Sequence, residues 1–223
     1  MKGLKRKIRD HKILRWSLLI STWIFQGMLR ADVTEKWFKI AFSCISSILL
    51  SCLLCIWLRL EWAIVLGFFV GHTLNWVINN NINVLLVHLL MLKTISKHEI
   101  FKYLDYLQAQ LVGKDWVLYA VVLGSISRGD LKPSSDIDVS IVRKPGIKNA
   151  FKAISFSIWQ KGVSDKRGIP MELYISDRIS NSVNRYKDEN KPVILAGDIT
   201  IITGHYPQSM LLDEAKRLNS YGD

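Results

Sequence analysis

Cysteine is scarce in this chain of 223 residues, and charge is nearly absent from one long segment of it. The three cysteines, Cys44, Cys52 and Cys55, all lie in one apolar stretch. They exclude the disulfide framework of small secreted domains, and nothing about them contradicts a reducing cytoplasm for the rest of the chain. Cys52 and Cys55 have the spacing of a redox or zinc pair, but no second pair of ligands accompanies them. We therefore interpret the three thiols as packing groups.

Basic residues outnumber acidic ones, and most of the excess lies at the front of the chain. Lys and Arg total 30 against 19 Asp and Glu, which leaves a net charge of +11. Residues 1–39 contain ten basic and three acidic side chains, whereas residues 40–92 contain only Arg59 and Glu61. A hydrophobic content of 49% excludes a disordered basic tail protein, and the length allows one catalytic domain with an appendage. A basic leader directly before an apolar block favours a membrane surface over nucleic acid.

The apolar block has the length of a transmembrane helical hairpin. Residues 40–58 form an uncharged run of nineteen, which as a helix reaches about the thickness of the hydrocarbon core. A second uncharged stretch covers residues 62–92 and is densely apolar as far as Ile78. Tryptophans lie near the ends of both runs, where indole rings favour the headgroup boundary: Trp37, Trp57, Trp62 and Trp76. The sequence predicts a hairpin over residues 40–92, with one span plus an interfacial helix as the alternative.

The leader MKGLKRKIRDHKILR predicts a cytoplasmic N-terminus. Two spans return the chain to the same side, so we expect an integral protein of the cell membrane with its remaining domain in the cytoplasm. A cleaved signal peptide fits less well, because the first long apolar run starts near residue 40 and lacks a cleavage site. Residues 16–29 are apolar but short, and we expect them to lie in the interface or to pack on the hairpin. A buried helix of a soluble domain is the alternative for this segment.

Polar residues share one helical face inside the second apolar stretch. They follow one another at spacings of three and four: His72, Asn75, Asn79 and Asn83. Lipid is an unfavourable neighbour for such a face. We expect these side chains to bond to an adjacent helix, with recognition of a lipid headgroup or a partner helix as the alternative.

Residues 93–223 are expected to form the soluble domain. Ser96 and Glu99 make a capping box, which predicts the start of a helix. Residues 116–124 (WVLYAVVLG) form a β-branched and aromatic run that ends at a glycine and predicts a buried strand. Apolar residues at helical spacing after the capping box predict the buried face of that first helix: Ile100, Tyr103, Leu104, Leu107 and Leu111.

The rest of the domain alternates between strand and helix patterns. Residues 136–142 and 169–175 are predicted strands, residues 148–164 a crossover helix, and residues 177–191 a helix that ends before Pro192. Residues 198–206 are predicted to form a last strand, and the C-terminal residues a short amphipathic helix that frays. The crossover helix is expected to face the core through the large apolar residues at helical spacing: Phe151, Ile154, Ile158 and Trp159.

Two carboxylates lie on the predicted strand 136–142. Asp136 and Asp138 are separated by one residue, so the period of two points both to one face. Like charges this close destabilise a sheet unless they are neutralised, and Mg²⁺ prefers hard oxygen ligands while leaving coordination sites for phosphates. The pair is therefore a candidate metal platform, with a solvated acidic edge as the alternative.

The turn before this strand and a later strand supply further candidates. Gly124 and Ser125 end the predicted strand 116–124, where a glycine lets the backbone approach a phosphate and a serine adds donors. Arg128 adds a cation, and Glu172 is a third carboxylate amid apolar neighbours of the predicted strand 169–175. His205 is a lone histidine near the end of the predicted last strand, and we interpret it as incidental, with a general base as the alternative.

The motif GSISRGDLKPSSDIDVSIV resembles the nucleotidyltransferase superfamily with the DNA polymerase β-like core, particularly its minimal bacterial and archaeal enzymes. The family pattern is Gly-Ser, a gap of about ten residues, Asp-x-Asp, and a third acid on a later strand. The resemblance covers roughly residues 115–176 and includes the Arg128-Gly129 pair. It implies an α/β (α+β) fold, namely a small mixed β-sheet with flanking helices, here preceded by the N-terminal transmembrane hairpin.

The resemblance also implies roles for the candidate residues. Gly124 and Ser125 would hold the triphosphate of an NTP, and Arg128 and Lys132 would screen its charge, although Lys132 is equally well explained as a solvated loop residue. Asp136 and Asp138 would bind two Mg²⁺ ions. Glu172, the third acid, would complete the ligand set and help deprotonate the attacking hydroxyl.

Two functions from different classes fit these patterns. The first is a membrane-anchored, Mg²⁺-dependent nucleotidyltransferase that moves NMP from an NTP to an acceptor and releases pyrophosphate. Its acceptor would be a partner protein, a small molecule or a membrane-associated molecule. The second is a nucleotide-binding regulatory or antitoxin-like module with little turnover. Specific nucleic-acid binding ranks below both, because phosphate attraction by the leader is nonspecific.

Overall fold

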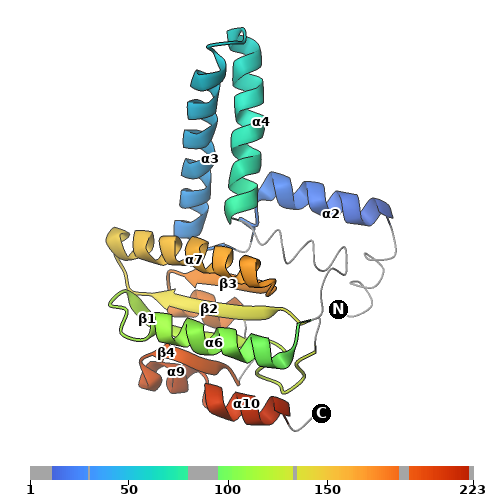
Figure 1. Ribbon diagram of the computed structural model, residues 1–223. Coiled ribbons are helices and arrows are strands. Elements are labelled where there is room, and N and C mark those ends of the chain that lie inside the picture. The colour runs from blue at the N-terminus through green and yellow to red at the C-terminus, as the bar shows by residue number, and fades with distance from the viewer. Residues whose placement is uncertain (1–11, 30, 80–94, 133–134, 186–190, 221–223) are drawn as a thin grey trace. The chain divides into compact units, whose positions relative to one another are not determined.

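The computed structural model describes residues 12–29, 31–79, 95–132, 135–185 and 191–220 (Figure 1). The chain divides into two compact units, residues 1–91 and residues 92–223, which are treated separately below.

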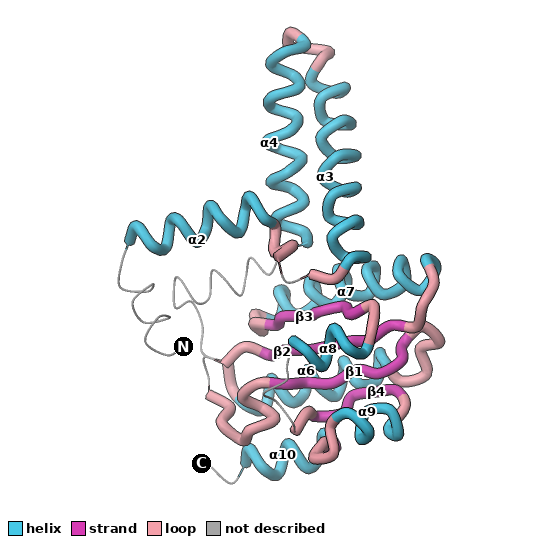
Figure 2. The backbone as a smooth tube through the Cα atoms, turned by 180° about the vertical axis from the view of Figure 1, so that it is seen from behind, coloured by secondary structure: helices cyan, strands magenta, loops and turns pink. Residues whose placement is uncertain are grey.

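The described residues of the first unit form three helices. Helix α2 covers Lys12–Phe25, α3 covers Val33–Leu54 and α4 covers Leu60–Asn79. Helices α3 and α4 lie side by side as a hairpin (Figures 1 and 2). Two segments are long and apolar enough to cross a membrane, Val33–Leu54 and Leu60–Ile78. The first was predicted at residues 40–58; it begins seven residues earlier, and residues 55–58 instead form the turn of the hairpin.

Small residues let the two hairpin helices approach closely. A Cβ atom added at Gly67 would lie 2.7 Å from the backbone nitrogen of Ser51, and one added at Gly71 would lie 2.6 Å from that of Ser47. Both distances are too short for any side chain, so the glycines and serines form a seam of the small-xxx-small type that joins helices in membranes.

The polar face of α4 bonds to neighbouring helices. Asn75, which is fully buried, donates hydrogen bonds to the Lys39 carbonyl oxygen at 2.7 Å and to Ser43 Oγ at 3.0 Å. His72 Nδ1 lies 2.8 Å from Gln26 Nε2. These contacts confirm, for His72 and Asn75, the prediction that the polar face serves association within the hairpin; the Asn79 side chain and Asn83 fall outside the described residues.

Helix α2 packs on the hairpin, which is one of the two placements expected for residues 16–29. Trp23 Nε1 donates to Thr73 Oγ1 at 3.0 Å, and the Trp23 carbonyl oxygen lies 3.0 Å from His72 Nε2. Cys44, Cys52 and Cys55 are free thiols with exposed side chains, so none of the three fills the interior of this unit.

The second unit contains a five-stranded mixed sheet with the order β3-β2-β1-β4-β5. Strand β1 is antiparallel to both β2 and β4, whereas β2 and β3 are parallel, as are β4 and β5. This is the mixed α/β architecture predicted from the sequence. The strands are β1 (Val117–Leu123), β2 (Ile137–Arg143), β3 (Met171–Ser176), β4 (Val193–Gly197) and β5 (Met210–Leu211).

Helices cover both faces of the sheet (Figures 1 and 2). One face carries α6, α7 and α10, and the other carries α8 and α9. Their bounds are α6 (Lys97–Leu111), α7 (Ile147–Arg167), α8 (Ile179–Arg185), α9 (Ile199–His205) and α10 (Leu212–Ser220).

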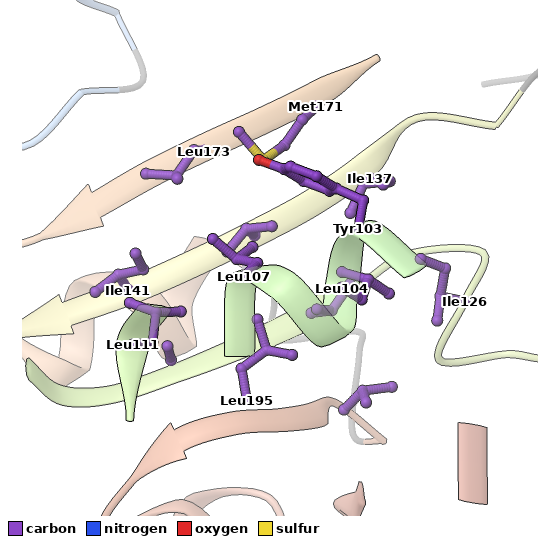
Figure 3. Packing of buried hydrophobic residues seen from close by; sticks show 14 of the residues in the cluster. Tyr103, Leu104, Leu107, Leu111, Ile126, Ile137, Ile141, Met171, Leu173 and Leu195 are labelled. Atoms are coloured by element: carbon purple, nitrogen blue, oxygen red, sulfur yellow. The ribbon is translucent and has the colours of Figure 1, made fainter. Parts of the chain in front are cut away.

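Helix α6 follows its sequence pattern closely. Ser96 caps it by accepting a hydrogen bond from the Glu99 amide at 3.2 Å. All five residues predicted for its buried face are buried, and Figure 3 shows four of them, Tyr103, Leu104, Leu107 and Leu111, among residues of β2, β3 and β4.

Helix α7 exposes part of the face that was predicted to be buried. Phe151 is 59% exposed and Trp159 is 66% exposed, whereas Ile154 is buried. The buried face consists mainly of small and polar residues: Ala150, Ala153, Ile154, Ser157, Gln160, Lys161 and Ser164. The prediction failed because it ranked side chains by apolar size, and the contact surface of α7 is formed by its small side chains.

One further prediction near the C-terminus was wrong, whereas the predicted amphipathic helix is present as α10. Residues 199–205, expected in a strand, form α9, which is capped by Asp198 through hydrogen bonds from the amides of Thr200 and Ile201. Helix α10, expected to fray, buries Ala215 completely and leaves only 2% of Asn219 exposed. For α9, the β-branched side chains favoured a strand in the sequence pattern, although Asp198 is the N-cap of a helix.

Candidate active site

The strand register brings the second and third carboxylates side by side. Asp138 of β2 pairs with Glu172 of the parallel strand β3. Asp136, predicted to lie in the same strand as Asp138, falls directly before it, because β2 begins at Ile137. The face that carries Asp138 is the one covered by α8, because Ser140, two residues after Asp138, shares a hydrogen bond of 2.9 Å with Ser182 of that helix. The backbone therefore directs Asp138 and Glu172 to one face of the sheet, with Asp136 directly before β2.

Gly124 lies directly against the Asp138 carboxylate. It follows Leu123, the register partner of Asp138 at the end of β1, and its φ of +83° is a conformation that favours glycine. A Cβ atom added at Gly124 would lie 2.7 Å from Asp138 Oδ2. Both the backbone conformation and the space therefore require glycine at the predicted turn.

The chain after Gly124 folds back on itself as a compact turn over residues 124–130. Ser127 Oγ donates to the Gly124 carbonyl oxygen at 2.9 Å, and the Asp130 amide donates to the Ser125 carbonyl oxygen at 3.0 Å. Ser125 Oγ is a buried atom without a hydrogen-bond partner within the described part of the chain. A buried hydroxyl of this kind costs free energy unless a ligand or water satisfies it, so Ser125 retains a donor for a bound anion.

The two basic candidates of the turn differ in their surroundings. Arg128 is exposed at the surface of the turn. Lys132 is also exposed and forms an ion pair with Asp130 at 3.3 Å, with more than half of each side chain accessible. Exposed pairs of this kind contribute little free energy, which agrees with the alternative interpretation of Lys132 as a solvated loop residue.

The side chain of Asn219 in α10 bonds to the backbone of the turn and of the residue that follows it. No sequence pattern predicts this role. Its Nδ2 donates to the Ile126 carbonyl oxygen at 3.0 Å, and its Oδ1 accepts from the Leu131 amide at 3.3 Å. Gly129 lies against the same helix, because a Cβ atom there would come within 2.8 Å of Leu218 Cγ.

Tyr174 contacts the third carboxylate. Its hydroxyl donates a hydrogen bond to Glu172 Oε2, and the two residues lie on one face of β3 because they are two apart. The period of two within Glu172-Leu173-Tyr174 is the sequence signal for this contact.

The three carboxylates are of the kind that Mg²⁺ prefers, but their side chains do not form a complete ligand set. Asp136, Asp138 and Glu172 supply hard carboxylate oxygens, and Gly124 leaves free the space where a side chain would crowd Asp138. Among the described residues, no three His, Cys, Asp or Glu side chains form a group with metal-binding geometry. The Glu172 carboxylate is instead engaged by Tyr174.

Two tyrosines on the same side of the sheet remain neutral phenols at physiological pH. Burial raises the pKa of Tyr206 to about 12 and also raises the pKa of Tyr119. Neither is therefore available as a base near neutral pH. His205 is exposed at the end of α9, a placement that agrees with its interpretation as incidental.

Residues 106–194 match the family described as the nucleotidyltransferase domain. The chain contains a nucleotidyltransferase domain. The matched range starts within α6 and ends in β4, so it includes the turn at residues 124–130 and all three acids. Asn219 lies outside the matched range of the nucleotidyltransferase domain. A search among curated proteins found no match to the chain.

Proposed function

We propose that the protein is a membrane-anchored, Mg²⁺-dependent nucleotidyltransferase that transfers NMP from an NTP to a hydroxyl or phosphate of an acceptor and releases pyrophosphate. The observation that supports this proposal most directly is the pairing of Asp138 with Glu172 on adjacent strands, with Gly124 against the Asp138 carboxylate. The acceptor classes are a partner protein, a small molecule and a molecule of the membrane, and anchoring favours the last.

In this proposal the turn binds the triphosphate. Ser125 Oγ, which has no partner within the described residues, donates to a phosphate oxygen. Arg128 is exposed beside it and neutralises phosphate charge. Asn219 acts as a positioning residue, since its side chain bonds to the backbone on both sides of Arg128.

The three acids would hold two Mg²⁺ ions in the same proposal. When bound, the metals supply charge neutralisation for the triphosphate and stabilise the attacking and leaving oxygens. Glu172 would accept the proton of the attacking hydroxyl, and Tyr174 would orient the Glu172 carboxylate until metal and substrate arrive. The backbone register of β2 and β3 keeps this acid beside Asp138.

The anchor is the hairpin of α3 and α4. Both helices are long and apolar enough to cross a membrane, and the seam at Gly67 and Gly71 is typical of helix pairs in lipid. Ten basic residues within positions 1–39 support a cytoplasmic N-terminus, and in this proposal two spans would return the chain to the cytoplasm before the nucleotidyltransferase domain.

The deciding experiment compares the full chain with the double variant Asp136→Asn/Asp138→Asn. Purified protein is incubated with each α-labelled NTP, Mg²⁺ and a membrane extract, and label is sought on lipid, protein and small molecules. We expect the double variant to lose transfer by about a hundredfold or more, because metal binding is required for the step. Asp213→Asn, an exposed acid of α10, is the matched control and should label like the parent.

Equal labelling by the parent and the double variant would contradict the enzyme proposal. Nucleotide binding by the parent without transfer to any fraction would favour the regulatory module instead. Extraction separates the anchoring proposal from both: carbonate should leave the protein in the membrane pellet, whereas release by salt would indicate a peripheral basic protein.

A further inference from the structure

The outer face of α7 is apolar although it belongs to neither core of the domain. This face consists of Ile147, Phe151, Ser155 and Trp159, which follow one another at intervals of four residues. Ile147 is 78% exposed, Phe151 59% and Trp159 66%. Of the seven large apolar side chains that are exposed among the described residues of the second unit, three lie on this one face.

The sheet cannot take up this face by rotation of the helix. The opposite side of α7 is already committed, because Ala153 is fully buried and Gln160 accepts a hydrogen bond from Tyr103 of α6 at 3.3 Å. A rotation would bury two aromatic rings where small residues now fit, and it would break this bond. The outer face is therefore a fixed property of the domain surface.

Three exposed lysines border the outer face, whereas Lys161 is buried and Lys152 forms an ion pair with Asp115. The segment 144–167 contains six Lys or Arg residues and a single acid, Asp165. Lys148 is exposed within the face, next to Ile147, and Lys144 and Lys166 are exposed at its two ends. Aromatic and aliphatic side chains with a border of lysines are the composition of helices that lie in a membrane interface.

We infer that the outer face of α7 binds the surface of an anionic phospholipid bilayer. The indole and phenyl rings enter the headgroup boundary, where amphipathic rings are favoured, and the lysines contact lipid phosphates, which attract basic side chains at an anionic surface. The inference rests on the proposed anchoring, since two spans in the same chain hold the domain at high local concentration beside a bilayer.

A second copy of the chain is a poorer occupant for this face. In a symmetric dimer the same patch meets itself, so the exposed lysines of the two copies would face one another and repel. An anionic bilayer instead complements their charge. A membrane therefore satisfies both the apolar rings and the basic border.

The experiment places an environment-sensitive fluorophore at position 155 of the full chain, in the middle of the outer face. The variant Ser155→Cys is made together with Cys44→Ser, Cys52→Ser and Cys55→Ser, and it is reconstituted in nanodiscs of phosphatidylcholine, with or without phosphatidylglycerol. We expect emission to shift to the blue, and quenching by spin-labelled lipids, in the discs with phosphatidylglycerol. The same label at Thr203→Cys, an exposed position on α9, is expected to respond to neither.

Two further proteins make the outcome unambiguous. Labelling of Cys52 alone, an exposed thiol on α3, reports anchoring. If spin-labelled lipids do not quench the label at Cys52, the proposed anchor is overturned. If they quench the label at Cys52 but not the label at position 155, the inference is overturned and the anchor stands. Lys148→Glu/Lys166→Glu should abolish the response at 155. A label at 155 that is shielded in both lipids, yet unquenched by spin-labelled lipids, is covered by protein and also overturns the inference.

Discussion

Helices α6 and α7 cover the same face of one sheet, yet they do so with opposite kinds of side chain. Helix α6 inserts large residues, of which Leu104, Leu107 and Tyr103 are fully buried. Helix α7 turns Ala150, Ala153 and Ser157 toward the interior and leaves the rings of Phe151 and Trp159 exposed. The comparison shows that the large apolar side chains identify the buried face of α6 but not that of α7.

The two helices are also joined by a polar contact. The Tyr103 hydroxyl of α6 donates to Gln160 Oε1 of α7 at 3.3 Å, and both residues are fully buried. The small buried face of α7 thus includes an amide that has its partner on α6. Five substitutions in four experiments test the energetic roles that this arrangement implies for the two helices.

The largest effect is expected on α6. Leu107→Ala removes a fully buried side chain and should reduce the free energy of unfolding of the domain by about 3 kcal/mol, through lost apolar burial and the cavity that remains. Hydrogen exchange of the β1 amides, followed by mass spectrometry on the full chain, measures the change. A loss below about 1 kcal/mol would show that the surroundings collapse into the site.

The opposite substitution tests α7. Ala153 is fully buried at the contact with the sheet, and Ala153→Leu should cost about 2 kcal/mol because extra methyl groups force neighbouring side chains from their rotamers. The same exchange measurement applies. Ala153→Ser is the control of similar size, and if leucine is tolerated as well as serine, the close packing of α7 is refuted.

Tyr103→Phe tests the contact between the two helices, with an expected cost of about 1 kcal/mol near neutral pH from the lost hydrogen bond. Burial, the largest cause, raises the pKa of Tyr103 above its ordinary value of 10.0. The neutral phenol is retained in the folded state, so its contribution is complete below about pH 10 and decreases as the pH rises above that value. Between pH 9 and pH 11.5 the free energy of unfolding of the parent should therefore fall more steeply with pH than that of the variant. Equal slopes for the two proteins would contradict this prediction.

The smallest effect is expected on the outer face of α7. Phe151→Ser and Trp159→Ser change exposed side chains, so each should alter the free energy of unfolding by no more than about 0.5 kcal/mol in detergent. Thermal unfolding in detergent measures this directly. A loss comparable with that of Leu107→Ala would mean that the rings are buried in solution.

The motif residues show what the sequence could predict about the site. The period of two on β2 and the glycine at the end of β1 are local properties, so the positions of Asp136, Asp138 and Gly124 relative to the turn followed from short stretches of chain. The pairing of Asp138 with Glu172 depends on the order and register of strands. It required the family resemblance, because residues 34 positions apart carry no local signal.

The misjudged element α9 and the short helix α10 share a physical origin. Residues 199–205 are rich in β-branched side chains, which favour strands, but Asp198 caps their first turn and the helix buries Ile202 against the sheet. Helix α10 was expected to fray, and contacts distant in sequence, such as those of Asn219 with the turn, hold it in place. In each case tertiary contacts overrode a local preference.

The position of Asn219 has a consequence for the order of events during synthesis. The turn at residues 124–130 leaves the ribosome long before residue 219 does, and its backbone gains both bonds to the asparagine only once α10 has docked. A nascent chain that has completed the sheet through β4 therefore still lacks this restraint on the turn. Under the proposed function, competence to bind nucleotide would be acquired only after residue 219 has been synthesised, when α3 and α4 have long left the ribosome.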